Sequence, residues 1–300
     1  MKQTRKMQKR MTLIADSGST KTAWLLRCEG HDDLLFEGVG INPVRDTEEE
    51  IRTAVEHVFA TFLGHMAVDP EFRSYSLLDG CLEVFFYGAG CIEPFKRSVE
   101  AALAASFLGG RVVVESDLLG AARALCGHEE GIACILGTGS NSCLYDGERI
   151  VANTSPLGWI LGDEGSGAVL GRTLVGDLLK GQLGEALKSA FFERFGLTQA
   201  DVIERVYRQP QANRWLASLV PFLAENRSDE GVRGLLVESF RSFFRRNVAA
   251  YGRRDLAVGF VGGVAWQFEA ELSEAAEAEG FKLGRIERRP IELMAAYHSA

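Results

Sequence analysis

Two short polar segments, residues 16–22 and 136–142, combine glycines with hydroxyl side chains directly after apolar, strand-like runs. The first reads Asp-Ser-Gly-Ser-Thr-Lys-Thr and the second reads Leu-Gly-Thr-Gly-Ser-Asn-Ser. Glycine lacks the Cβ atom that would keep a ligand away from the main chain. Successive amide groups in such a turn can converge on phosphate oxygens, with Ser and Thr hydroxyls as further donors. An ordinary β-hairpin turn is the alternative for either segment alone, but the pair, about half a chain apart, predicts a polyphosphate site.

Asp16 opens the first of these segments with a negative charge that would repel phosphate directly. Beside a nucleotide, such a carboxylate is best explained by a divalent cation. Mg²⁺ binds through one or two carboxylates together with substrate phosphates and usually keeps several waters. The segment therefore predicts Mg²⁺ alongside the phosphates.

Asp117 follows a short apolar strand predicted over 111–115 and begins a helix predicted over 118–125. Open α/β sheets bind their ligands outside the carboxyl ends of the strands. A carboxylate at that place can act as a general base if an attacking hydroxyl lies within hydrogen-bonding reach. The alternative is a plain helix N-cap, for which Ser116 or Asp117 would suffice.

Residues 158–167 form a glycine-dense loop that contains Trp159 and the adjacent acids Asp163 and Glu164. Neighbouring carboxylates repel each other, so a partner must offset their charge. Sugar hydroxyls would do so by donating hydrogen bonds, and Gly158 and Trp159 would shape the pocket around a sugar ring. The alternative is a solvated turn before a helix N-terminus, although four glycines in ten residues exceed what one turn requires.

Two further places have weaker signals. Gly262 and Gly263 stand between an apolar strand and a helix start, where bare backbone would admit a flat ring or a phosphate; close packing of helix on strand is an equal alternative. Asn42 precedes Pro43, a common beginning of a turn. The five histidines show no metal-ligand spacing.

The bulk composition is that of a globular protein and narrows the partners. The chain has 300 residues, a net charge of −8 and a pI near 5.3, which argues against nucleic acid because such partners normally leave a basic footprint. The six cysteines are scattered without a C-x-x-C spacing. No secretory signal and no apolar stretch of about 18 residues is visible, so we expect no membrane span and a cytoplasmic location. The basic first ten residues are expected to be a frayed terminus.

The order of elements predicts two α/β domains. Strands are expected within 12–28 and at 33–40, 83–87, 111–115, 131–136, 142–145, 148–152, 256–261 and 281–286. Helices are expected at 46–63, 92–105, 118–125, 264–278 and 291–298, with a long helical stretch over 168–252 that breaks at Pro210 and Pro221. The two halves therefore look like relatives of one β-β-β-α unit.

The ordered motifs D-x-G-x-T-K-T, Ser-Asp before a helix, L-G-T-G-S-N, G-D-E-G-S and V-G-G-V-A resemble the sugar-kinase branch of the actin, hexokinase and chaperone ATPase superfamily. More narrowly, they resemble the BadF/BadG and N-acetylglucosamine kinase family, and the match extends from Met11 to the end of the chain. The resemblance implies an α/β fold of two ribonuclease H-like domains with a nucleotide cleft between them. We place these at 1–116 and 117–290, with a helical insertion at about 168–252 and a closing helix at 291–300 that packs back on the first domain.

The resemblance also implies roles for single residues. Asp117 falls at the catalytic base, Asp16 at a water-mediated contact to Mg²⁺, and Gly262 and Gly263 at the adenosine motif. Phosphate ligands are implied at Gly18, Ser19, Thr20, Lys21, Thr22, Gly137, Thr138 and Gly139. Contacts to the hydroxyls and N-acetyl group of a sugar are implied at Asn42, Asn141, Asp163 and Glu164. Ile160 departs from the pattern, because the animal N-acetylglucosamine kinases have glycine there.

The expected activity is ATP-dependent phosphorylation of a sugar hydroxyl, on N-acetylglucosamine or a related amino sugar, with ATP and Mg²⁺ as cofactors. A homodimer is compatible with the family. One alternative is an ATPase that activates a redox partner through an iron–sulfur cluster, and another is a sugar sensor without catalysis. The segment 115–120 lacks the D-I-G-G-Q-D pattern of the activator branch, and the ten residues before Met11 are too short for an added DNA-binding module.

Overall fold

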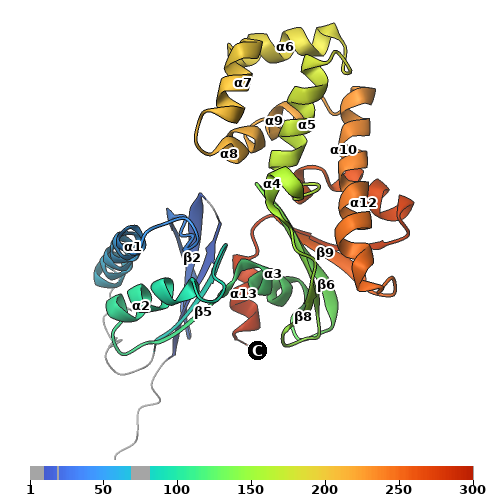
Figure 1. Ribbon diagram of the computed structural model, residues 1–300. Coiled ribbons are helices and arrows are strands. Elements are labelled where there is room, and N and C mark those ends of the chain that lie inside the picture. Colours follow the sequence, from blue (N-terminus) through green and yellow to red (C-terminus); the bar gives the residue numbers. More distant parts are fainter. Residues whose placement is uncertain (1–9, 19, 69–81, 300) are drawn as a thin grey trace, which may run out of the picture. The chain divides into compact units, whose positions relative to one another are not determined.

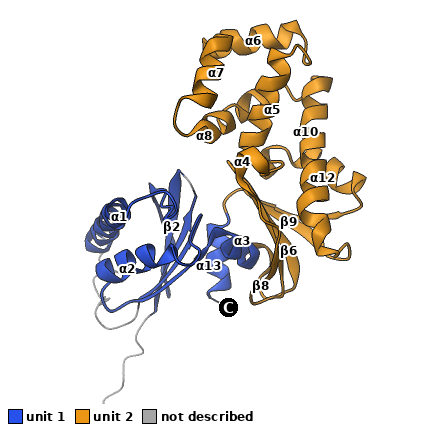
Figure 2. Cartoon of the chain, in the orientation of Figure 1, with its two compact units in different colours: residues 1–124, 290–300 blue, residues 125–289 orange. Residues whose placement is uncertain are grey.

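The computed structural model describes residues 10–18, 20–68 and 82–299. The predicted phosphate ligand Ser19, the cysteine at 81 and the basic residues before Arg10 lie outside these ranges. The chain divides into two compact units, one made of Met1–Ala124 and Pro290–Ala300 and the other of Leu125–Arg289 (Figure 2).

The first unit is built on a five-stranded sheet with the order β3-β2-β1-β4-β5 (Figure 1). Its strands are β1 (Met11–Ser17), β2 (Lys21–Cys28), β3 (Leu34–Val39), β4 (Leu82–Gly88) and β5 (Arg111–Ser116). The first three are antiparallel neighbours, whereas β1, β4 and β5 run parallel. The carboxyl ends of β1, β4 and β5 therefore meet at one edge of the sheet.

Alternation along the strands of the first unit assigns helices to both faces of the sheet. Leu13 and Ala15 share a buried cluster with residues of α1 (Glu48–Val68) and α2 (Lys96–Ser106). Ile14, between them, points to the other face and packs with α3 (Asp117–Cys126) and α13 (Ile291–Tyr297). Through α3 the first unit extends to Ala124, so the division lies beyond the boundary expected at 116.

The second unit has a sheet of the same topology, with the order β10-β9-β6-β7-β8. Its strands are β6 (Gly131–Leu136), β7 (Ser140–Tyr145), β8 (Ile150–Asn153), β9 (Ala257–Val261) and β10 (Lys282–Glu287). Each strand corresponds to the strand five places earlier in the first unit, with the same pairing directions. This repetition confirms the predicted relationship between the two halves.

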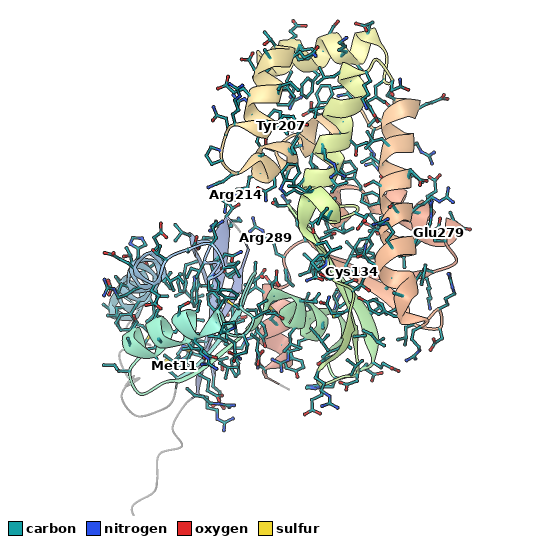
Figure 3. The ribbon with its side chains drawn as sticks, in the orientation of Figure 1. Met11, Cys134, Tyr207, Arg214, Glu279 and Arg289 are labelled. Atoms are coloured by element: carbon teal, nitrogen blue, oxygen red, sulfur yellow. The ribbon has the colours of Figure 1, made fainter. Side chains whose placement is uncertain are left out.

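A helical region stands between β8 and β9, as expected for 168–252. It comprises α4 (Gly158–Leu161), α5 (Gly167–Leu179), α6 (Glu185–Phe195), α7 (Gln199–Tyr207), α8 (Ala212–Ala217), α9 (Val220–Glu225), α10 (Glu230–Phe243), the π-helical turn η3 (Phe244–Val248) and the 3₁₀ turn η4 (Ala249–Tyr251). Phe240, Phe243 and Phe244 join it to the sheet in one buried cluster. Cys134, labelled in Figure 3, belongs to the same core.

Two expected helices differ in detail. Residues 264–278 form two helices, α11 (Gly263–Gln267) and α12 (Glu269–Ala278), separated at Phe268. The helix expected from 92 begins only at Lys96, because Pro94 disfavours the helical conformation of the residue before it. Among the described residues, none of the helices has the length and apolar character needed to cross a bilayer.

Candidate active site

The first glycine-rich segment is the tight turn between β1 and β2. Gly18 N donates to Lys21 O over 3.0 Å, and Gly40 N donates to Thr20 O over 3.1 Å. A Cβ atom on Gly40 would come within 2.8 Å of Lys21 N and would collide with the Gly18 carbonyl. The chain just after β3 therefore packs directly against the turn. Gly18 and Thr20 are exposed and keep the turn open to a ligand.

Two side chains of this turn that we predicted to bind phosphate, Lys21 and Thr22, have partners within the protein. Thr22 is fully buried; its Oγ1 donates to Val39 O over 2.8 Å and lies 2.7 Å from Ser17 Oγ. The structure therefore places the Thr22 side chain inside the sheet rather than at the surface of the turn. Lys21 is exposed and pairs with Glu37 at 2.7 Å, so binding phosphate would require it to change partner.

Asp16 and Asp117 lie at the shared carboxyl end of the parallel strands. Asp16 is in β1, and Asp117 directly follows β5, with β4 and its terminal Gly88 between them. Adjacent strands are about 4.8 Å apart, so the two main chains are separated by about 10 Å. Burial, together with repulsion from Asp117, raises the pKa of Asp16 to about 7. Burial also raises the pKa of Asp117 to about 6, opposed by hydrogen bonds from backbone amides.

The helix cap and the candidate base are different residues. Ser116 Oγ accepts a hydrogen bond from Leu119 N at 3.2 Å, which is the contact of an N-cap. Asp117 Oδ1 accepts from Leu118 N at 2.9 Å, which orients the carboxylate. Ser116 is therefore the N-cap, and Asp117 is the first residue of α3.

Asn42 lies beside the loop that follows β4. Its Oδ1 accepts from Val44 N over 3.0 Å and occupies the space that a Cβ atom on Gly90 would need. The next residue, Cys91, is close enough to Asp117 for that carboxylate to help raise its thiol pKa to about 12, although burial is the larger cause. The first unit therefore gathers Asn42, Asp16 and Asp117 at one edge of its sheet.

The second glycine-rich segment is the corresponding turn of the second unit, between β6 and β7. Gly167 N donates to Gly137 O at 2.8 Å, and Ala168 N donates to Thr138 O at 3.1 Å. These bonds turn the carbonyls of the segment toward the start of α5. A Cβ atom on Gly137 would meet nothing within 4 Å, so a ligand can approach the main chain there.

Asp163 lies against this second turn. Its Oδ2 would be 3.1 Å from a Cβ atom on Gly139, and its backbone has a φ of 52°, which residues other than glycine rarely adopt. Burial raises the pKa of Asp163 to about 6, and Glu164 adds to the rise, whereas a hydrogen bond from the Ser140 amide lowers it. The structure thus brings Asp163 together with the turn that contains Thr138.

Glu164 is bonded within the protein. Its carboxylate accepts from Arg246 Nε and from Asn247 Nδ2, the latter at 3.1 Å. Arg246 offsets the charge of Glu164 and Asn247 adds a hydrogen bond, a role that we expected sugar hydroxyls to fill. Trp159 of the same loop is partly buried and packs against the core of the second unit, whereas Gly158 is exposed.

The amide of Asn141 has a fixed orientation. Its Oδ1 accepts from Ser142 N and from Asn153 Nδ2, both over 2.9 Å. A backbone amide can only donate, so the atom facing it must be the oxygen. Asn141 therefore presents Nδ2 as the group that it can offer to a ligand, and Asn42 does the same because Val44 N fixes its Oδ1.

Gly262 and Gly263 differ in their surroundings. Gly262 has a φ of 121°, and a Cβ atom there would collide with the Leu136 carbonyl at the end of β6. At this position glycine therefore allows the close packing of helix on strand. A Cβ atom on Gly263 would meet nothing within 4 Å. Gly263 lines an open cavity of about 360 Å³. The other lining residues are Val220, Pro221, Ala224, Glu225 and Gln267.

The described residues include no group of three or more His, Cys, Asp or Glu side chains that could hold a metal ion by themselves. Asp16 nevertheless fits Mg²⁺, which is held largely by phosphates and water with one or two carboxylates. The raised pKa of Asp16 marks a carboxylate that would be stabilised by a nearby cation.

Comparison with known proteins decides the family. A crystal structure of a candidate N-acetylglucosamine kinase from Porphyromonas gingivalis is 47% identical, with a TM-score of 0.89, and the match covers 96% of this chain and 98% of that one. The chain belongs to the BadF/BadG and N-acetylglucosamine kinase family. No family model matches the chain, and no curated protein matches it.

More distant structures support the fold alone. A candidate N-acetylglucosamine kinase from Chromobacterium violaceum is 19% identical with a TM-score of 0.74, covering 96% of this chain and 98% of that one. MreB5 of Spiroplasma citri, in a structure bound to ADP, is 10% identical with a TM-score of 0.55, covering 97% and 95%. The two units thus have the predicted actin-like ATPase fold of paired ribonuclease H-like domains.

Proposed function

We propose that this family member is an ATP-dependent sugar kinase that phosphorylates a hydroxyl of N-acetylglucosamine or a related amino sugar. The observation that carries the proposal is the 47% identity, over 96% of the chain, to a candidate N-acetylglucosamine kinase. The acids and glycine-rich turns of the site support it independently, because they supply a base, phosphate ligands and acceptors for sugar hydroxyls.

In the proposed reaction, Asp117 accepts the proton of the sugar hydroxyl while that oxygen attacks the γ-phosphorus of ATP. The new O–P bond forms as the bond between the γ-phosphorus and its bridging oxygen breaks, and ADP leaves. Reactions of this kind depend mainly on positioning and electrostatic stabilisation. The amide of Leu118 holds Asp117 Oδ1 in place, and a pKa raised to about 6 suits a base that works near neutrality.

The phosphates would be bound by the main chain of both turns. Gly18 and Thr20 are exposed on the first turn, and Thr138 and the open face of Gly137 contribute on the second. Lys21 and Gly139 complete these turns. Bound Mg²⁺ would neutralise the negative charge of the phosphates, and Asp16 would hold it through water. Gly263 and the cavity beside it suit the adenosine.

The sugar contacts proposed for Asn42, Asn141 and Asp163 are chemically complementary to an N-acyl sugar. Both amides present their Nδ2 groups, which donate hydrogen bonds to a carbonyl or hydroxyl oxygen. Ionised Asp163 accepts hydrogen bonds from hydroxyl groups. A ligand with one acyl carbonyl and several hydroxyls satisfies this set of donors and acceptors.

The test is a measurement of phosphate transfer by the full chain with ATP and Mg²⁺. N-acetylglucosamine, N-acetylmannosamine, glucosamine and glucose are offered separately, and both ADP and the phosphorylated sugar are quantified. We expect an N-acyl amino sugar to be the best acceptor. Asp117→Asn should lower kcat by about 10²–10⁴-fold, whereas Asp32→Asn, the same substitution at an exposed acid, should not.

Three outcomes would contradict the proposal. Near-full transfer by Asp117→Asn would exclude its role as the base. Formation of ADP without a phosphorylated sugar would indicate an ATPase instead. Tight sugar binding without any ADP formation would indicate a sensor.

A further inference from the structure

Helix α10 continues into the π-helical turn Phe244–Val248, which is followed by the 3₁₀ turn Ala249–Tyr251. Turns of π-helix are rare and are frequently found at functional sites. Asn247, within this turn, is a buried polar residue with 5% of its surface exposed. A buried amide is expected to have hydrogen-bond partners, and its partners lead to the candidate substrate residues.

One branch of these hydrogen bonds leads to the acid pair. Asn247 Nδ2 donates to Glu164 Oε2 at 3.1 Å, and Arg246 Nε donates to Glu164 Oε1. Both oxygens of this carboxylate are thus held, and its side chain is only 14% exposed. Because Asp163 precedes Glu164 directly and has a φ of 52°, the anchored neighbour helps to hold Asp163 in this conformation.

A second branch leads to the segment that contains Asn141. Thr154 Oγ1 donates to Asn247 O at 3.0 Å, and Thr154 N donates to Tyr251 Oη at 3.0 Å. Tyr251 Oη in turn lies 2.7 Å from Ser142 Oγ, next to Asn141. Residues 247–251 are therefore linked by hydrogen bonds to segments 141–142 and 163–164. These two segments contain the side chains of the second unit that we propose to bind the sugar.

We propose that Asn247 and Tyr251 are positioning residues for the sugar site. Asn247 holds Glu164 and thereby directs Asp163, whereas Tyr251 holds Ser142 and thereby directs Asn141. In this arrangement Glu164 links the loop to η3 and does not itself bind the sugar. The inference rests on the proposed function, because it names residues that position the side chains of the same proposed sugar site.

The test compares Asn247→Ala and Tyr251→Phe with wild type in steady-state kinetics that vary the sugar and ATP separately. Loss of a hydrogen bond to a charged group should raise the sugar KM of Asn247→Ala by about ten-fold. The ATP KM should change by no more than about two-fold, because the side chain of Asn247 bonds to Glu164 in the loop of the acid pair. Gln209→Ala is the matched control, since the Gln209 amide donates to the Glu204 carboxylate at 3.4 Å on the exposed surface beside α7 and should leave both KM values unchanged.

A double-mutant cycle tests the route through Glu164. If Asn247 acts by holding Glu164, then Asn247→Ala should have little further effect on the sugar KM in a Glu164→Ala background, because residues of one network are not additive. Additive effects would overturn this route. An unchanged sugar KM in both Asn247→Ala and Tyr251→Phe would overturn the proposal, as would an equal rise in the KM of both substrates.

Hydrogen exchange without ligands separates this inference from the proposed function. Amides of residues 157–167 should exchange faster in Asn247→Ala than in wild type, whereas those of β1 and β2 should not change. Unchanged exchange in 157–167 overturns the positioning role even if the wild type is an active kinase. Faster exchange together with no phosphate transfer to any sugar by the wild type means that the proposed function, and not the positioning contact, has failed.

Discussion

Asp117, the proposed base, stands out by its place in the fold and by its raised pKa. It begins α3 at the carboxyl end of β5, and Ser116 performs the capping that would otherwise explain an acid there. Its partial burial disfavours the charged form and raises its pKa to about 6. At that pKa the carboxylate is mostly ionised near neutrality and still basic enough to accept a proton.

The pH dependence of activity should follow this pKa. A general base works only when deprotonated, so kcat should fall as the pH drops through about 6 and level off above about 7. Asp163 has a pKa raised to about 6 as well, and its protonation should instead raise the sugar KM. Measurement of kcat and KM across this range, in wild type and in Asp163→Asn, separates the two acids. A kcat that stays constant from about pH 5 to 8 would contradict the assignment of Asp117.

At the scale of the elements, the two adjacent glycines after β9 have different tasks. Gly262 has a positive φ and touches the end of β6, whereas Gly263 has open space and lines a cavity of about 360 Å³. The first position concerns the packing of helix α11 on the sheet. The second concerns what can approach the start of that helix.

Alanine at these two positions should therefore change different properties, the stability of the fold at Gly262 and the KM for ATP at Gly263. Gly262→Ala should destabilise the fold by about 1–3 kcal/mol, because it places a Cβ atom against a carbonyl at a φ of 121°. Gly263→Ala should leave the melting temperature unchanged and raise the KM for ATP, because the added methyl group narrows the cavity. Thermal unfolding and ATP kinetics of both variants check this pair. Equal loss of stability in the two variants would contradict the distinction.

The sequence was sufficient to predict most elements but not the contacts between distant ones. Apolar runs bounded by turn residues predicted strands such as 131–136, and the long helical stretch between β8 and β9 was also expected. The partners of Glu164 were not predictable from the sequence. Arg246 and Asn247 lie about 80 residues further along the chain, in a π-helical turn that no sequence pattern indicated. Thr22 belonged to a convincing turn motif, yet its side chain is buried between strands.

At the scale of the whole molecule, the two units repeat a topology but not its chemistry. The turns after β1 and β6 occupy equivalent places in the two sheets, so the repeat supplies a glycine-rich turn twice. The carboxyl ends of β5 and β10 are equivalent as well. The first is followed by Asp117, whereas the second is followed by Arg288. The place of the candidate base in the first unit is therefore taken by a basic residue in the second unit.

The stability of the molecule should depend on the ionisation of Asp16, the proposed contact to Mg²⁺. Its pKa in the folded protein is about 7, above the value of 3.8 that an unperturbed aspartate has. Between these two values the folded state binds more protons than the unfolded state, so the free energy of unfolding falls as the pH rises. The Asp16 carboxylate thus destabilises the ligand-free fold at neutral and alkaline pH.

Asp16→Asn should therefore melt at a higher temperature than wild type at about pH 8, by at least about 2 °C, and the difference should shrink toward about pH 4. Mg²⁺ with a non-hydrolysable ATP analogue should reverse the order, because ligands that bind only the folded state stabilise it and the variant lacks the carboxylate that would hold the cation. Asp32→Asn, at an exposed acid, should follow wild type in both series. A lower melting temperature of Asp16→Asn at about pH 8, without ligands, would show that the carboxylate has a stabilising partner instead.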